Sequence, residues 1–330
     1  MPIMVTGSIA TDHLMRFPGR FADQFVAEAL DRVSLSFLVD DLTVRRGGVA
    51  ANIAYGLAQL GTTATLVGAV GHDFADYRSW LERNGVDCTA LYVSTRAHTA
   101  RFVCTTDDDM CQIASFYPGA MAEAGGIDLG ALFAGSAPDL VLVGADEPAA
   151  MLRHADACRR HGVPMAADPS QQLARMSGED VLRFIDGAAY LLTNEYEHHL
   201  LEARTGLDAD ALLDRVGRHV TTLGADGVRI RERGRPDVHV PAAPCETIAE
   251  PTGVGDAFRA GFFAALARRL PLVTAAQVGC QLAVEVLRVS GPQEYALDWE
   301  RFAADLSRSY GAPAAAQVRR AWTAAPATAS

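Results

Sequence analysis

Short apolar runs alternate with segments of helical periodicity along most of the chain. In segment 74–84, for example, Phe74, Tyr77, Trp80 and Leu81 share one face, as the buried side of an amphipathic helix requires. This alternation predicts an α/β fold, a doubly wound and mostly parallel sheet covered by helices on both faces. The predicted strands are residues 3–9, 63–70, 138–144, 163–168 and 188–193, and the predicted helices are residues 48–60, 74–84, 149–161, 177–186, 195–204, 208–217, 256–269, 273–288 and 298–309.

Two stretches interrupt this alternation. The first, residues 11–18 and 33–46, includes the strand-like run 34–39, and the second, residues 98–117, is typical of a hairpin with strands 99–106 and 110–117 and a turn at 107–109. We expect a small projecting sheet whose apolar face covers a ligand or meets a partner subunit. The expected division is a large domain of residues 1–10, 47–97 and 118–311, a small β lid of residues 11–46 and 98–117, and a tail of residues 312–330 that is rich in Ala and Pro. We expect about the last ten residues of that tail to be disordered.

Composition limits the classes of partner. The chain has 330 residues, of which 49% are hydrophobic, and this is enough for a substantial core. Its formal net charge of −11 argues against general binding to nucleic acids or to anionic membranes. No apolar run reaches the roughly 18 residues of a membrane span, and the first residues lack the basic region of a signal peptide. We therefore expect a cytoplasmic protein.

The chain contains no lysine, so all 29 of its basic residues are arginine. This excludes the Walker A loop, the protein-kinase strand lysine, and the Schiff-base lysine of pyridoxal enzymes. A Rossmann dinucleotide site has no support either, because no G-x-G-x-x-G motif follows a predicted strand. If the protein handles ATP, it does so with backbone amides, arginine and a metal ion.

Cysteine and histidine give no clear metal or redox motif. The six cysteines form no Cys-x-x-Cys pair. Cys104 and Cys111 lie across the predicted hairpin, either as two reduced thiols, the default in the cytosol, or as a disulfide. Glu195 and His199 lie one helical turn apart and either hold a metal or form a solvated helix face, which the absence of a third ligand favours.

The most informative segment is residues 250–261, where small residues run directly into an apolar helical stretch. A loop of Gly253, Val254 and Gly255 can turn its N–H groups into one concavity with the first turn of that helix, as an anion hole for phosphate requires. Asp256 then stands where it can take a proton from a hydroxyl that attacks the phosphate. The alternative is a glycine-rich connection whose aspartate caps the helix.

Four further segments occupy predicted loop positions, where the carboxyl ends of parallel strands line a ligand cleft. They are residues 7–12, 47–52, 194–197 and 221–227. Gly-Gly-x-x-x-Asn at 47–52, Asn-x-x-Glu at 194–197, Thr-x-Gly at 222–224 and Gly-x-Gly-Asp at 253–256 follow in the order typical of one family. From residue 7 to about residue 293, the chain resembles the ribokinase-type (PfkB) carbohydrate kinases. Within that family it is most similar to the bacterial adenosine kinases, with near-verbatim likeness at residues 6–14, 34–42, 114–120 and 167–175.

The resemblance implies a ribokinase-like fold and the transfer of the ATP γ-phosphate to the 5′-hydroxyl of adenosine. At the reacting group, it implies Asp256 as base and Gly253, Val254 and Gly255 as anion hole. For the ribose hydroxyls, it implies contacts from Asp12, Gly48 and Asn52. On the ATP side, it implies Asn194 near the phosphates, Glu197 as an organiser of Mg²⁺ through water, and as ATP-binding positions Thr222, Leu223, Gly224, Ala225, Asp226, Gly227 and Gly255. Many members carry an aspartate near a monovalent-cation site where this chain has Glu250, so K⁺ activation is a further expectation. A homodimer through the lid is also implied, with segment 33–46 bringing Ser36 or Phe37 to the partner's pocket.

Residue chemistry supports these implied roles. A carboxylate and an amide together can hold the vicinal hydroxyls of a ribose. Phe102 and Phe116 either stack on an adenine ring or form the core of the lid. The ring's polar edge can be read by Ser8, Ser36, Gln171 or Gln172, and Arg175 either neutralises phosphate or anchors a loop.

In-line phosphoryl transfer relies mainly on positioning and charge stabilisation, so the base needs no large pKa shift. The main alternative is a sugar kinase of the ribokinase or fructokinase type, since Asp12 and Asn52 would serve a sugar equally well. The aromatic pair and the two glutamines favour a nucleoside. A non-catalytic nucleoside sensor is disfavoured because the base and its anion hole are both present.

Overall fold

The computed structural model describes residues 1–25, 32, 34–135 and 137–323. Within these residues, nine strands form one large sheet in the order β13-β12-β11-β10-β9-β8-β1-β4-β5. All neighbours from β5 to β11 pair in parallel, whereas β12 and β13 are antiparallel additions at one edge. The strands are β1 Ile3–Thr6, β4 Ala64–Val70, β5 Leu91–Val93, β8 Leu140–Val143, β9 Met165–Ala167, β10 Tyr190–Asn194, β11 Arg218–Thr222, β12 Val228–Glu232 and β13 Val238–Val240.

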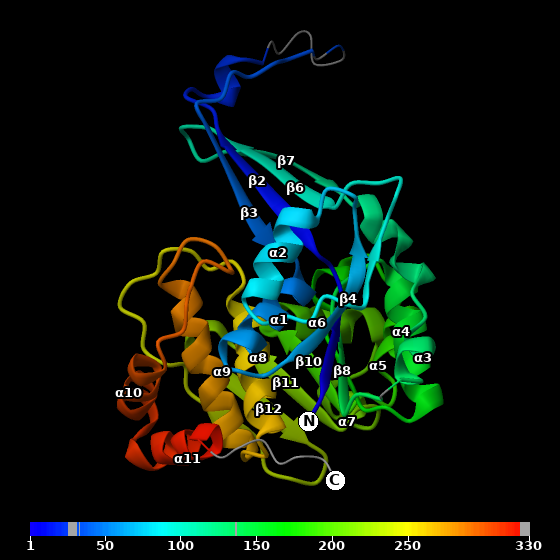
Figure 1. Ribbon diagram of the computed structural model, residues 1–330, viewed down its shortest axis with the longest axis vertical. Helices are drawn as coiled ribbons and strands as arrows, with labels where there is room; N and C mark the ends of the chain where they lie inside the picture. The colour runs from blue at the N-terminus through cyan, green and yellow to red at the C-terminus, as the bar shows by residue number, and fades with distance from the viewer. Residues whose placement is uncertain (26–31, 33, 136, 324–330) are drawn as a thin grey trace.

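Helices cover both faces of this sheet, as the alternation of strands and helices predicted (Figure 1). Side chains of β1 and β8 alternate between two cores: Ile3 and Leu140 pack with one helical layer, and Met4 and Val141 with the other. The first layer contains α1 Val49–Gln59, α2 Ala75–Arg83, α8 Val254–Ala267, α9 Leu272–Leu287, α10 Trp299–Tyr310 and α11 Ala312–Thr323. The second contains α3 Leu129–Phe133, α4 Pro148–His161, α5 Gly178–Ile185, α6 Glu195–Thr205 and α7 Ala209–Leu213.

A second sheet of four strands, in the order β3-β2-β6-β7, projects from one end of the large sheet (Figure 1). The predicted hairpin is confirmed as β6 Ala100–Thr106 and β7 Gln112–Tyr117, and it pairs with β2 Ala10–Arg16 and β3 Asp41–Gly47. The register sets Phe102 opposite Phe116 and beside Asp12, so these three side chains share one face of the lid.

The run 34–39, predicted as strand-like, forms no strand, and β3 begins only at Asp41. Phe37 instead packs against the rings of Phe17 and Phe21, because its apolar surface is buried better in an aromatic cluster than along a sheet edge. The predicted helix 208–217 was too long: α7 ends at Leu213, and the chain turns into β11.

Residues 312–323 form α11, whose Val318 is fully buried against the main core. Of the ten or so final residues expected to be disordered, 321–323 thus belong to a helix, and 324–330 lie outside the described residues.

Cys104 and Cys111 are free thiols, so the reduced alternative holds. Nδ1 of His199 donates to the backbone carbonyl of Glu195 over 2.8 Å, and the described residues contain no group of three acidic, His or Cys side chains that could hold a metal. No helix among them is long and apolar enough to cross a membrane.

The position of α8 depends on a close contact with α9 through two glycines. A Cβ added to Gly261 would lie 2.8 Å from the Cα of Gly279, so neither helix has room for a side chain there. We predict that Gly261→Val lowers the free energy of unfolding by about 1–3 kcal/mol, the usual cost of overpacking, in thermal denaturation. Gly126→Ala is the matched control, because nothing lies within 4 Å of an added Cβ. Equal stability of the two variants would contradict this account of the helix pair.

Candidate active site

Of the predicted glycine loop, Gly253 lies before the helix, whereas Val254 and Gly255 belong to it, because α8 begins at Val254 and not at residue 256. Gly253 precedes the helix with a left-handed backbone (φ 81°), and an added Cβ there would collide with Pro292. The N–H of Val254 donates to the carbonyl of Pro251 over 3.4 Å, and the N–H of Ala257 to the carbonyl of Gly253 over 2.9 Å. A glycine turn that enters a helix N-terminus is the kind of backbone that binds anions, and the anion hole stays a prediction.

Asp256 lies in the first turn of α8, at the floor of a cleft between the large domain and the lid. Desolvation by burial raises the pKa of this carboxyl to about 6, although the charge of Arg259 and a hydrogen bond from Asn52 oppose the rise. The Nδ2 of Asn52 donates to Oδ2 of Asp256 over 2.8 Å. Asp256 is thus ionised at neutral pH, yet more basic than an ordinary aspartate, which suits a general base.

A buried ion pair supports this carboxyl, and the sequence analysis assigned it no role. Arg259 lies one turn after Asp256, and its Nη2 donates to Oδ1 of Asp168 over 2.7 Å while Nε lies 2.5 Å from Oδ2. The guanidinium also abuts the anion loop, since a Cβ on Gly255 would lie 2.8 Å from Nη1. The i, i+3 spacing of Asp256 and Arg259 was the available signal, because it places both on neighbouring parts of one helix face.

Asn52 is oriented by a chain of hydrogen bonds. Its Oδ1 accepts from Nε2 of Gln293 over 2.9 Å, and Gln293 also contacts Oη of Tyr77 over 2.6 Å. Tyr77 in turn donates to the carbonyl of Gly47 over 2.9 Å. These contacts fix which end of the Asn52 amide faces Asp256, so its NH₂ group must be the one that donates.

The cleft has a volume of about 360 Å³, within the usual range for a small-molecule site. It brings together residues from both domains, and only Ser36 among the predicted substrate contacts is missing from its lining, being exposed elsewhere on the lid. The predicted contacts that line it are Ser8, Asp12, Gly48, Asn52, Phe102, Phe116, Gln171, Gln172 and Arg175, together with Gly253 and Asp256.

Several of these positions have a clear local cause. Gly48 has a φ of 97°, and a Cβ would lie 2.5 Å from the carbonyl oxygen of Ser8, so only glycine fits. The hydroxyl of Ser8 accepts from the N–H of Val49 over 3.1 Å and so caps α1. Phe116 is 49% exposed, so its ring presents a free face to the cleft instead of filling a lid core. Desolvation raises the pKa of Asp12, with Glu250 adding to the rise and Arg45 opposing it.

The predicted ATP positions follow the carboxyl ends of β10 and β11, beyond the lining of this cleft. Asn194 and Glu197 form a capping box at the start of α6, each side chain accepting from the other's backbone N–H over 2.7 Å. The capping contact uses Oε2 of Glu197, and the role of this carboxylate towards Mg²⁺ stays a prediction. The predicted turn, residues 222–227, is confirmed between β11 and β12, with left-handed backbones at Gly224 (φ 59°) and Gly227 (φ 95°).

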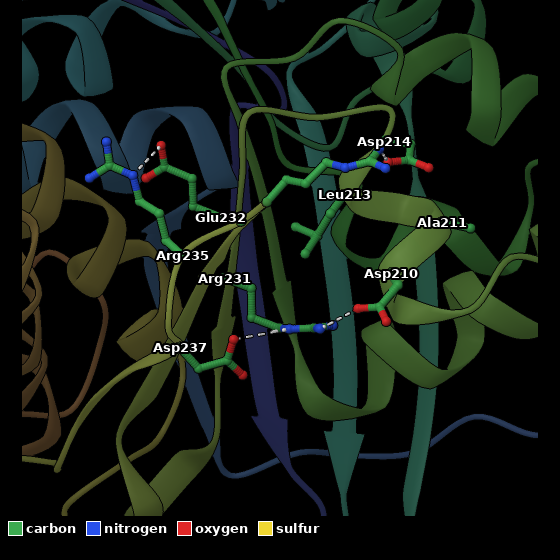
Figure 2. A pocket seen from close by; sticks show the side chains of 10 residues that line it. Asp210, Ala211, Leu213, Asp214, Arg231, Glu232, Arg235 and Asp237 are labelled. Atoms are coloured by element: carbon green, nitrogen blue, oxygen red, sulfur yellow. Dashed lines mark hydrogen bonds and ion pairs between the residues drawn. The ribbon is translucent and has the colours of Figure 1, made fainter.

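A second cavity lies at the antiparallel edge of the large sheet and carries none of the predicted site residues. Figure 2 shows Arg231 between Asp210 and Asp237, at 2.6 Å and 3.4 Å respectively. Arg235 is paired with Glu232 in the same way. Because carboxylates already pair with both arginines, neither of them offers an unpaired positive charge to an anionic ligand in this cavity.

The comparisons with known proteins agree with this geometry. The model of the pfkB family carbohydrate kinases matches residues 7–299. A nucleoside kinase of Methanocaldococcus jannaschii is 27% identical over 257 residues, which cover 77% of this chain and 83% of that protein. The solved structure of a Burkholderia thailandensis nucleoside kinase in complex with inosine is 32% identical, with a TM-score of 0.82 over 94% of this chain and 98% of that chain. The same enzyme in complex with ADP-inosine gives a TM-score of 0.80 and covers 94% of this chain and 96% of that chain.

The pKa of Asp256 predicts an acid limb near pH 6 in the pH profile of kcat/KM for phosphoryl transfer. Below that pH the carboxyl is protonated and cannot accept a proton, so activity should fall about tenfold per pH unit. The charge of Arg259 lowers this pKa more than the charge of Asp168 raises it, so the double variant Arg259→Gln/Asp168→Asn, which removes both charges, should move the limb to higher pH.

The control is Asp146→Asn. Asp146 is also buried, with its pKa raised by burial to about 7, but it does not line the cleft. This variant should leave the limb in place. A limb that moves with Asp146 and not with Arg259 would contradict the assignment of Asp256.

Proposed function

The chain belongs to the pfkB family of carbohydrate kinases and is an ATP-dependent phosphotransferase, and on this basis we propose that it is an adenosine kinase. It would transfer the γ-phosphate of ATP to the 5′-hydroxyl of adenosine, giving AMP and ADP in purine salvage. The observation that carries the choice of a nucleoside is the Phe102–Phe116 pair. Both rings line the same cleft as Asp256, and Phe116 is 49% exposed, so a ribose alone would leave aromatic surface uncovered.

In the proposed reaction, Asp256 accepts the proton of the 5′-hydroxyl as the oxygen attacks phosphorus. Asn52 holds the carboxylate in one orientation, which keeps its free oxygen available to the substrate. The N–H groups from Gly253 to Gly255 donate to the oxygens of the transferred group, and Arg259 adds positive charge behind them. Bound Mg²⁺ would neutralise the ATP phosphates, with Glu197 holding it through water.

Adenosine is favoured over inosine by Gln172. Its side chain is buried at the cleft wall, and in the assigned orientation Oε1 has no hydrogen-bond partner among the described residues. An unpartnered buried acceptor requires a donor, and the exocyclic amino group of adenine is a donor where inosine has a carbonyl. The Burkholderia relative was solved with inosine, so this side chain is where we expect purine selectivity to be decided.

A sugar kinase is the second candidate, because a ribokinase of Bacillus subtilis is 30% identical over 226 residues, covering 67% of this chain and 74% of that protein. Asp12 and Asn52 would hold a sugar and a nucleoside ribose alike. The two candidates therefore differ in what covers the aromatic pair, and a substrate comparison separates them.

We predict that phosphate transfer from MgATP is fastest to adenosine when adenosine, guanosine, inosine, ribose and fructose are compared in parallel. Asp256→Asn should lower kcat by a factor of about 10²–10⁴ while adenosine binding, measured by calorimetry, stays largely intact. Gln172→Leu should reduce the preference for adenosine over inosine by about tenfold. Faster transfer to ribose or fructose would favour the sugar kinase, and equal loss of turnover and binding in Asp256→Asn would argue against a base.

We also propose a homodimer that covers the outer face of the lid. Because side chains alternate along a strand, the residues next to Asp12, Phe102 and Phe116 point away from the cleft. This outer face exposes Leu42 (56%), Val44 (54%), Ile113 (42%) and Tyr117 (45%). These residues lie on the two edge strands, β3 and β7, and exposed apolar side chains on both edges of one sheet face favour an interaction site there.

Light scattering at micromolar concentration should give the mass of a dimer. Leu42→Glu/Val44→Glu should shift it towards the monomer, because two charges would then be buried against the partner sheet. Val273→Glu, at a 43% exposed position on α9, is the control and should remain dimeric. A monomeric wild type would end the proposal.

A further inference from the structure

Arg45, near the end of β3, joins the lid to the segment that leads into α8. Arg45 forms an ion pair with Glu250, and its Nη2 also lies 3.2 Å from Oγ of Ser290. The hydroxyl of Ser290 donates to the same oxygen of Glu250 over 3.2 Å. Only 19% of the Arg45 side chain and 22% of the Glu250 side chain are exposed, so this cluster is largely removed from water.

The cluster lies where the lid, the anion loop and the loop before α10 meet. Glu250 directly precedes the segment that enters the anion loop, and β3 runs from Arg45 into Gly48 and α1. The backbone of Gly291 lies against the Arg45 stem, because an added Cβ would be 3.4 Å from Cδ. Pro292, the next residue, packs on Gly253. Through these contacts, a change in the charge of Glu250 would act on the backbone around Gly253, where we propose that phosphate binds.

The expectation of a K⁺ ion at Glu250 does not fit these contacts. Oε2 of Glu250 already accepts from the guanidinium of Arg45 and the hydroxyl of Ser290. An ion bound to this carboxylate would meet the positive charge of Arg45 at close range, and the two like charges repel each other.

We propose that the Arg45 guanidinium is the resident cation of this site, so that the enzyme needs no monovalent ion. In its place, a protein charge neutralises Glu250 and ties the lid strand to the anion loop. The inference rests on the proposed function, since it concerns the ion dependence of the same catalytic centre.

Four proteins test the proposal: the wild type, Arg45→Met, Arg45→Met/Glu250→Gln, and Arg46→Met. Arg46 is the matched control because it is on the same strand and anchors elsewhere, 3.6 Å from Glu294 and over the ring of Trp80. For each, kcat/KM with MgATP and the best nucleoside is measured in choline chloride and in KCl at equal ionic strength. Melting temperatures without substrates are recorded in the same two salts.

The kcat/KM of the wild type and of Arg46→Met should differ less than about twofold between the two salts, because Glu250 stays paired. The kcat/KM of Arg45→Met should be about tenfold or more below that of the wild type in choline chloride. It should recover most of this loss in KCl, because K⁺ binds the exposed carboxylate. Its melting temperature should rise in KCl by about 2 °C or more. The double variant, which lacks both charges, should show no K⁺ response in either measurement.

Activation or stabilisation of the wild type by K⁺ would overturn the proposal, and this arm does not depend on any variant folding. So would an Arg45→Met protein that ignores K⁺, or a double variant that still responds to it. Failure of the proposed function would look different: the wild type would transfer phosphate to no nucleoside, while the melting temperatures would still report whether Arg45 replaces the ion.

Discussion

The burial of a carboxylate at the start of α8 is the constraint on which the rest of the site depends. Burial of Asp256 disfavours its charged form, and protonation of the carboxyl would remove this desolvation cost. Two contacts from different parts of the chain offset that cost, the amide of Asn52 on α1 and the charge of Arg259 on α8. Since Arg259 is itself buried, it requires Asp168 after β9. One carboxylate thus fixes the relative positions of three elements.

The packing around α8 follows from the same requirement. Helices α8 and α9 approach through Gly261 and Gly279, which leaves no slack along the helix that carries Asp256 and Arg259. On the other side, Asn52 is held by Gln293 and Tyr77, so the amide that faces Asp256 is tied to the loop before α10. The site is therefore built on two helix starts and on their contacts, rather than on a flexible loop.

The sequence predicted what depends on local pattern. Alternation of strands and helices predicted the layered sheet, and the hairpin pattern predicted the two strands that carry Phe102 and Phe116. It did not predict the pairing of Arg259 with Asp168 or of Arg45 with Glu250, because each joins segments far apart in the chain and only folding brings them together. The run 34–39 failed for a related reason: its apolar residues suit a strand, but an aromatic cluster with Phe17 and Phe21 buries Phe37. The roles carried over from the family for the ATP positions stay predictions.

The absence of lysine gives these ion pairs a common character. Every basic side chain near the site is an arginine, and its planar fork holds a carboxylate in one direction while remaining protonated at any working pH. Asp168 and Glu250 are each paired with an arginine from another element. The hydrogen-bond partner of Asp256, in contrast, is the neutral amide of Asn52. Protonation of Asp256 therefore breaks no ion pair. A general base needs this property, because it gains a proton in every turnover.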